Sequence, residues 1–354
     1  MSQELKLNTE YPEPDERQVT ERLIVLLKGV IEQRYLTGVT TRDVHVKGHA
    51  AVRAEVSVEP NLPEEFRVGV FGEPRTYPAW VRFSNSSESP KEDIKGDIRG
   101  FALKLMGVEG EKLLDPEAEM TTHDFIFLST NVFLTKDARD FLKLVETGAL
   151  NKKKTLSNYV QMFRYFFITH PEVRKVLRDS SRKFPHLLEI EWFSATPYLL
   201  GHRAVKYVLK PHQQTRSQLP SNPSPNYLRE RIVEHLAREG AGFDFMVQPQ
   251  VDPRREPIEN GLMPWDERHA PLYKVATVRI PRQEVGWPER QRIPENLSFN
   301  PWRCLPEHRP LGSANRVRKE VYRAISDFRR ARNNVPVAEP SPDGGTGAPA
   351  GSAA

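Results

Sequence analysis

The chain has 354 residues, a formal net charge of +5, and 28% charged against 38% apolar residues, which is typical of a soluble globular protein with one large or two modest domains. Its one cysteine, Cys304, excludes an intrachain disulfide and a zinc–thiolate cluster. No apolar stretch is long enough to span a membrane, and the polar N-terminus lacks the core of a signal peptide, so a cytoplasmic location is expected.

The first part of the chain combines one helix with several short strands. Residues 1–18 are expected to form a flexible arm, and helical spacing of apolar residues predicts a helix over 21–35. Alternation of apolar and polar residues, or a short apolar run, then predicts strands over 52–58, 79–83, 101–105 and 123–128.

The pattern changes to helices between about 137 and 180. Further strands are predicted near 189–193, 203–209, 243–248 and 273–280, and a helix over 225–239 is stopped by Gly240. The last helix is predicted over 314–334 with Ser313 as a candidate N-cap, and residues 335–354, rich in Pro, Ala, Gly and Ser, are expected to be a disordered tail.

About eight strands joined mostly by turns predict an α+β fold, in which an antiparallel β-barrel or large sheet is surrounded by helices. Strands occur on both sides of the helical block, so residues 19–334 are interpreted as a single domain. No internal repeat is present.

The last helix carries a tyrosine at the border of its apolar stripe. Arg318 and Tyr322 are four residues apart and therefore share one helical face. Arg329 is seven residues after Tyr322 and lies on the same face. A surface tyrosine between two arginines is the ordinary interpretation. The chemical alternative is that a guanidinium favours the phenolate form of tyrosine, which is a known ligand of haem iron. The basic residues of this helix suit a solvated face, and no nucleic-acid partner is predicted.

A histidine precedes the first valine-rich strand. Continued alternation would place His45 on the face opposite Val44 and Val46, and Gly48 is a candidate for a β-bulge or for a close backbone approach. His45 and His49 would then share a strand face, but no third ligand at a recognisable spacing supports zinc.

Four segments, in this order, carry a recognisable pattern: RDVHVKG at 42–48, VRFSNS at 81–86, DIRGFALK at 97–104, and the Arg-x-x-x-Tyr sequence at 318–322. Together they resemble the haem-containing catalase family, and more closely its shorter catalase-related branch. The resemblance covers about residues 40–140 and 185–330, and it implies a catalase-like barrel whose C-terminal helix carries the ligand of haem b.

The resemblance also assigns roles to single residues. It implies that Tyr322 ligates the iron with Arg318 holding it as phenolate, that His45 is the distal acid–base group, and that Ser84 orients its imidazole. Arg42, Arg82 and Arg329 would bind the haem propionates. Val44, Phe133 and Phe141 would line the distal pocket.

The segment after the fourth strand departs from the family pattern. The family has a distal asparagine just before a Pro-x-Phe-Phe run, whereas this chain reads LSTNVFL at 128–134. The aligned position is Leu128 or Ser129, and Asn131 falls where the proline is expected. Asn131 is therefore the candidate polar partner of His45, with Ser129 as the alternative.

The implied chemistry is heterolysis of a peroxide by His45 acting as acid and base. Hydrogen peroxide or an organic hydroperoxide would be the substrate, with a small-molecule reductant that the sequence does not identify, and a homo-oligomer is compatible with the resemblance. A lipid-hydroperoxide isomerase similar to allene oxide synthases is an alternative reaction. A haem-binding protein for storage or sensing, and a haem-free barrel that binds a small ligand, are the non-enzymatic alternatives.

Overall fold

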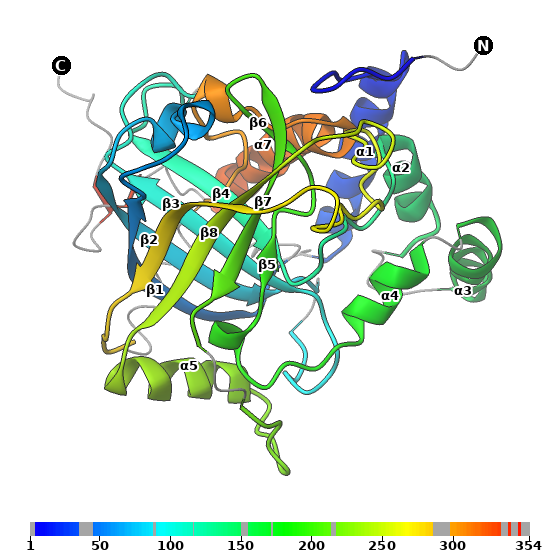
Figure 1. Ribbon diagram of the computed structural model, residues 1–354. Coiled ribbons are helices and arrows are strands. Elements are labelled where there is room, and N and C mark those ends of the chain that lie inside the picture. The colour runs from blue at the N-terminus through cyan, green and yellow to red at the C-terminus, as the bar shows by residue number, and fades with distance from the viewer. Residues whose placement is uncertain are drawn as a thin grey trace, which may run out of the picture.

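The computed structural model describes residues 4–34, 45–87, 90–115, 117–149, 155–170, 173–213, 217–285, 298–333, 339–340 and 346–347. Within these ranges the chain forms an antiparallel barrel with helices packed outside it (Figure 1). No helix of the described part is both long and apolar enough to cross a membrane.

Eight strands close the barrel. Their order around it is β5-β4-β3-β2-β1-β9-β8-β7, and β5 pairs with β7 to complete the ring. A short strand, β6 (Tyr198–Leu200), also pairs with β7. The barrel strands are β1 (Gly48–Val58), β2 (Thr76–Asn85), β3 (Arg99–Met106), β4 (Thr122–Leu128), β5 (Trp192–Phe193), β7 (Arg203–Pro211), β8 (Ala241–Pro249) and β9 (Tyr273–Ile280).

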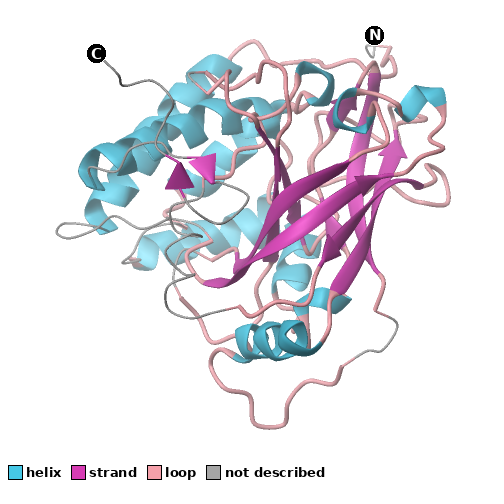
Figure 2. Cartoon of the chain, turned by 90° about the vertical axis from the view of Figure 1, so that its left-hand side faces the viewer, coloured by secondary structure: helices cyan, strands magenta, loops and turns pink. Residues whose placement is uncertain are grey.

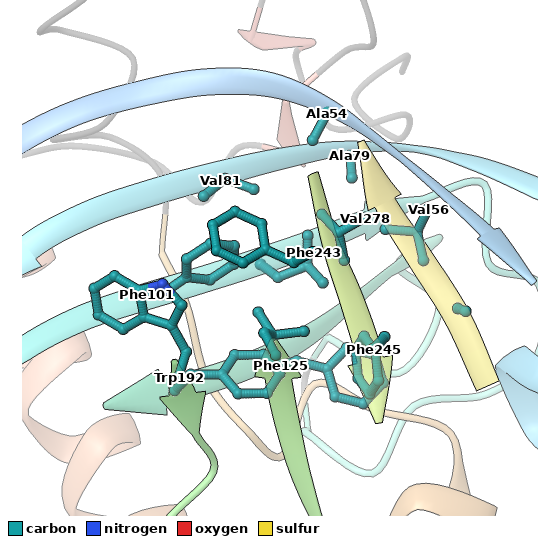
Figure 3. Close-up of a cluster of buried hydrophobic side chains, with 14 of the residues drawn as sticks. Ala54, Val56, Ala79, Val81, Phe101, Phe125, Trp192, Phe243, Phe245 and Val278 are labelled. Carbon is teal, nitrogen blue, oxygen red and sulfur yellow. The ribbon is translucent and has the colours of Figure 1, made fainter. Parts of the chain in front are cut away.

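Aromatic and branched side chains fill the inside of the barrel (Figure 3). The rings of Phe101 and Phe243 are 5.5 Å apart, and those of Phe125 and Phe245 are 5.1 Å apart. Successive residues of a strand point to opposite sides. The residues between these core positions on β2, β3 and β4 therefore face the outside of the barrel, toward the helices.

Three helices form a layer against that outer face. They are α1 (Glu16–Arg34), α2 (Ala138–Glu146) and α7 (Ser313–Asn333), which share an apolar cluster that includes Leu23, Val145 and Val321. Figure 2 shows most helices on one side of the strands. The remaining elements are α3 (Leu156–Phe163), a π-helix (Arg164–Thr169), α4 (Arg174–Ser180), α5 (Tyr227–Arg238), and 3₁₀ turns at Glu64–Phe66, Gly69–Phe71, Leu187–Glu189 and Pro306–His308.

Some element bounds differ from the sequence predictions. The strand predicted over 189–193 is reduced to Trp192–Phe193, because residues 187–189 form a 3₁₀ turn whose Leu188 N–H donates to the His186 ring. α7 begins at Ser313 itself, and the Ser313 hydroxyl accepts a hydrogen bond from the Ala138 N–H at the start of α2.

The two ends of the chain also have local structure. In the segment expected to be an arm, the N–H of Asn8 donates to Gln250, the N–H of Tyr11 donates to Glu259, and Glu10 pairs with Arg309. In the segment expected to be a tail, β10 (Glu339–Pro340) pairs with β11 (Thr346–Gly347), and the other residues after Asn333 lie outside the described ranges.

Candidate functional site

A large cavity lies between the outer face of β2–β4 and the helices α1, α2 and α7. Its volume is about 400 Å³, and it is open to solvent on one side. Helix α1 contributes Leu27, Val30 and Ile31 to its wall, although no motif in the sequence marks these residues as part of a site. Seven of the residues singled out in the sequence line this one cavity: His45, Arg82, Ser84, Phe133, Phe141, Arg318 and Tyr322.

The barrel wall of the cavity is built from two rows of paired residues. Ser84, Gly100 and Leu128 are directly opposite one another on β2, β3 and β4. The next row consists of Arg82, Ala102 and Ile126. Because paired residues of neighbouring strands point to the same face, each row presents its side chains to the cavity together, and all six residues line it.

His45 packs against the first row, next to Ser84 and Gly100, but it does not belong to a strand. It precedes β1, which begins at Gly48, and its φ angle of 57° lies in the left-handed region. The prediction that strand alternation orients His45 is therefore wrong, since alternation requires extended backbone. The predicted bulge is confirmed, because the pairing register of β1 with β2 shifts between Gly48 and Ala50.

Neighbouring groups hold this turn and its imidazole. The His45 N–H donates to the Ser86 carbonyl at 3.2 Å, and Arg82 Nη2 donates to the His45 carbonyl at 2.8 Å. The His45 Nδ1 atom lies 3.0 Å from Ser84 Oγ. A Cβ atom on Gly100 would lie 2.7 Å from both Cε1 and Nδ1 of the ring. The absence of a side chain at position 100 thus makes room for the imidazole.

The helical wall carries the tyrosine and its arginine. Arg318 Nε donates to Tyr322 Oη at 3.3 Å, and Arg318 Nη1 donates to Asn315 Oδ1 at 3.0 Å. The guanidinium also lies 5.6 Å from the centre of the Phe133 ring. Burial alone would lower the pKa of Arg318, but the phenols of Tyr322 and Tyr198 outweigh it and raise that pKa. The guanidinium beside Tyr322 therefore stays charged.

The structure does not bring Asn131 to this cavity. Asn131 lines a separate cavity with Lys206 and Trp265, and its Oδ1 atom is buried without a hydrogen-bond partner. The Ser129 hydroxyl accepts a hydrogen bond from the Arg99 N–H and does not line the large cavity either. Leu128 instead lines the cavity next to Gly100. Of the two aligned candidates, the one that faces the cavity is therefore apolar.

Three predicted cofactor-binding residues are not placed. Arg42 and Val44 lie outside the described residues, and Arg329 is part of α7 without a described side chain. His49 is buried with Nε2 2.6 Å from Asn85 Oδ1, and burial lowers its pKa well below the ordinary value. No cluster of three metal-ligating side chains exists among the described residues.

Two residues of the site, Gly100 and Leu128, had only weak signals in the sequence. Gly100 stands in the RGFA segment without any sign that a ring lies against it. Leu128 was one of two positions that aligned with the missing asparagine, and it is the one of the two that pairs with Gly100 and lines the cavity.

Comparison with known proteins gives the same family that the motifs resemble. Residues 33–184 match the family model described as Catalase. No curated protein sequence matches the chain significantly. Among solved structures, a fungal catalase superposes with a TM-score of 0.63 at 17% identity over 94% of this chain and 66% of its own length.

Two further structures agree with this result. A bacterial catalase gives a TM-score of 0.62 at 16% identity, over 96% of this chain and 70% of the other. Catalase A from Saccharomyces cerevisiae gives 0.63 at 15% identity, over 94% and 68%. At these identities the likeness establishes the fold, and the chain spans about two thirds of the length of these proteins.

Proposed function

We propose that this chain, whose residues 33–184 match the Catalase family model and whose fold is similar to that of catalases, is a haem-dependent oxidoreductase that processes peroxides, with Tyr322 as the iron ligand. One observation carries the proposal. A tyrosine with a charged arginine and a histidine with an orienting hydroxyl, far apart in the sequence, line the same cavity.

The residues of this cavity suit a haem. Apolar and aromatic side chains, such as Phe133, Phe141 and Val321, form much of its wall, and Arg82 supplies a cation for a propionate. A phenol beside a buried guanidinium is a suitable donor for ferric iron. When bound, the haem would supply a redox-active iron that takes up the oxidising equivalents of the peroxide.

His45 would move the proton. Because Ser84 engages Nδ1, we assign proton exchange with the substrate to Nε2. The imidazole takes the proton of one peroxide oxygen and delivers it to the other, so that the O–O bond breaks with release of water or an alcohol. Ser84 and the Arg82 contact to the His45 carbonyl keep the ring in place during the transfer.

The ligand assignment is tested by the absorption spectrum of the haem-loaded chain. Tyr322→Phe is expected to abolish the spectrum typical of tyrosinate-ligated ferric haem, because phenylalanine has no oxygen donor. Tyr159→Phe, at an exposed position on α3, serves as the matched control and is expected to leave the spectrum unchanged. An unaltered spectrum of the Tyr322 variant would show that another group binds the iron.

The apolar barrel wall favours peroxidase activity over disproportionation of hydrogen peroxide. Disproportionation requires a second hydrogen peroxide to be held beside the histidine, whereas Leu128, Ala102 and Ile126 offer no hydrogen bond from their side chains. The same surface suits the alkyl part of an organic hydroperoxide. We therefore propose weak oxygen release and readier oxidation of organic donors.

Leu128→Asn tests this preference. An amide in the row of Gly100 is expected to raise oxygen release from hydrogen peroxide about tenfold, the value of one hydrogen bond of about 1.4 kcal/mol in the transition state. Ile126→Asn places the same amide one row away and is expected to give a smaller gain. Fast oxygen release by the native chain would contradict the proposed preference for organic donors.

A further inference from the structure

The helix α3 and the π-helix that continues it present an apolar face to solvent. Thirteen large apolar side chains are exposed in the described part of the chain, and six of them lie between residues 156 and 168. These six are Leu156, Tyr159, Val160, Phe163, Phe167 and Ile168, with exposed fractions between 51% and 81%. We call them the α3 face.

The α3 face is not the edge of a packed helix. None of the residues of α3 is buried, although the helix is well capped, since Thr155 and Asn158 form a capping box. Its apolar residues recur at helical spacing, which normally predicts a face turned to the core. A helix this short gains little stability from its backbone alone. An outward apolar face on such a helix indicates a surface that binds something.

Basic residues lie within and after the α3 face in the sequence. Between residues 155 and 183 the sequence has six Lys and Arg residues against Glu172 and Asp179. Asp179 is buried and bound by Lys175 and Thr130. A set of exposed aliphatic and aromatic side chains flanked by basic residues is the pattern of helices that lie in the surface of a bilayer. Figure 1 shows α3 at the periphery of the molecule, away from the barrel.

We propose that the α3 face docks this protein on the surface of a bilayer containing anionic phospholipids. The apolar side chains enter the region between headgroups and acyl chains, and the basic residues contact the headgroups. A second copy of the chain fits less well, because a symmetric dimer through this face would bring two net positive surfaces together.

Docking through the α3 face would also place the large cavity near the lipid. On the inner side of the same segment, Tyr165 and Phe166 belong to the apolar cluster that contains Ile98, Leu128 and Leu134. These last three residues also line the large cavity. Docking would therefore hold one wall of the cavity close to the lipid surface. The inference does not depend on the reaction proposed above.

The test is co-sedimentation of the full chain with vesicles of phosphatidylcholine alone or mixed with phosphatidylglycerol. We expect binding to the mixed vesicles that weakens with salt. The double variant Val160→Asp and Phe163→Asp should lower the partition coefficient at least about tenfold, because it removes apolar contacts and adds two repelled charges. Val25→Asp with Val251→Asp, two exposed valines elsewhere, is the matched control and should stay within about twofold of the native chain.

A second measurement does not depend on the folding of the charged variant. Val160→Trp should show a blue shift of tryptophan emission with the anionic vesicles and none with the neutral ones. Absence of vesicle binding, or equal losses in the two double variants, would overturn the proposal. So would a dimer in sedimentation velocity that only the Val160/Phe163 variant dissociates, since the α3 face would then be an interface between copies.

Discussion

Gly100 has no side chain, and this leaves room for the imidazole of His45. With a Cβ only 2.7 Å from the ring, Gly100→Ala must displace the imidazole. We expect haem binding to persist and the reaction with peroxide to slow about 100-fold, the lower end of what a positioned acid–base group contributes. Stopped-flow mixing with peroxide measures the rate.

The matched control is Gly29→Ala, where a Cβ meets nothing within 4 Å. If Gly100 acts only through His45, the double variant Gly100→Ala with His45→Ala should react no more slowly than His45→Ala alone. A clear further loss in the double variant would show that Gly100 has another role in the site.

At the scale of elements, periodicity predicted most of the helices and strands. The stripe of α7 that carries Arg318 and Tyr322 was predicted from residue spacing, and the hydrogen bond between them agrees with it. Strand alternation failed for His45, because a single left-handed residue interrupts the extended backbone and no local sequence signal marks it. The place of Leu128 in the site depends on pairing with Gly100, which is a contact between strands that spacing along one strand does not reveal.

Arg316 connects three elements that are distant in the sequence. Its guanidinium pairs with Glu10 of the N-terminal segment, Glu16 of α1 and Glu259 of the loop after β8. Removing the cation would leave three partly buried carboxylates close together. Arg316→Met is therefore expected to lower the free energy of unfolding by about 3 kcal/mol, within the range for breaking a buried ion pair.

Urea unfolding followed by circular dichroism measures this loss. Arg17→Met provides the comparison, because the Arg17–Glu21 pair is exposed on both sides and should contribute less than about 0.5 kcal/mol. Equal effects of the two substitutions would mean that the Arg316 cluster does not hold α1 against α7.

The whole molecule is expected to lose stability in mild acid because it buries neutral histidines. His308 is an example: its Nε2 accepts a hydrogen bond from the Val70 N–H, and its Nδ1 lies 3.0 Å from the Tyr207 hydroxyl. Burial lowers its pKa from 6.5 to about 3. Burial also lowers the pKa values of His49 and His123 well below the ordinary value.

The direction of the pH effect follows from which state binds the proton. Between pH 6.5 and about 3 the unfolded chain protonates His308 and the folded chain does not, so the stability present above pH 6.5 is lost as the pH falls. At pH 5 the loss from His308 is about 2 kcal/mol. His308→Gln should reduce the difference between unfolding free energies at pH 7.5 and 5 by that amount, and the exposed His202→Gln should not. The same pH dependence in both variants would contradict this account.

The ring of strands closes through a very short element, and this has a consequence for its dynamics. β4 and β5 share a single residue pair, Leu128 with Phe193, and β5 and β7 share two. Local opening begins where backbone hydrogen bonds are few. We call the junction of β4, β5 and β7 the seam, and we expect its strands to separate transiently while the long β1–β2–β3 ladders stay paired. We expect the amides of residues 192–193 to exchange with deuterium before those of β2 and β3. Since Leu128 belongs both to the seam and to the cavity wall, the β4 part of that wall is expected to move aside for a bound molecule more readily than the parts on β2 and β3.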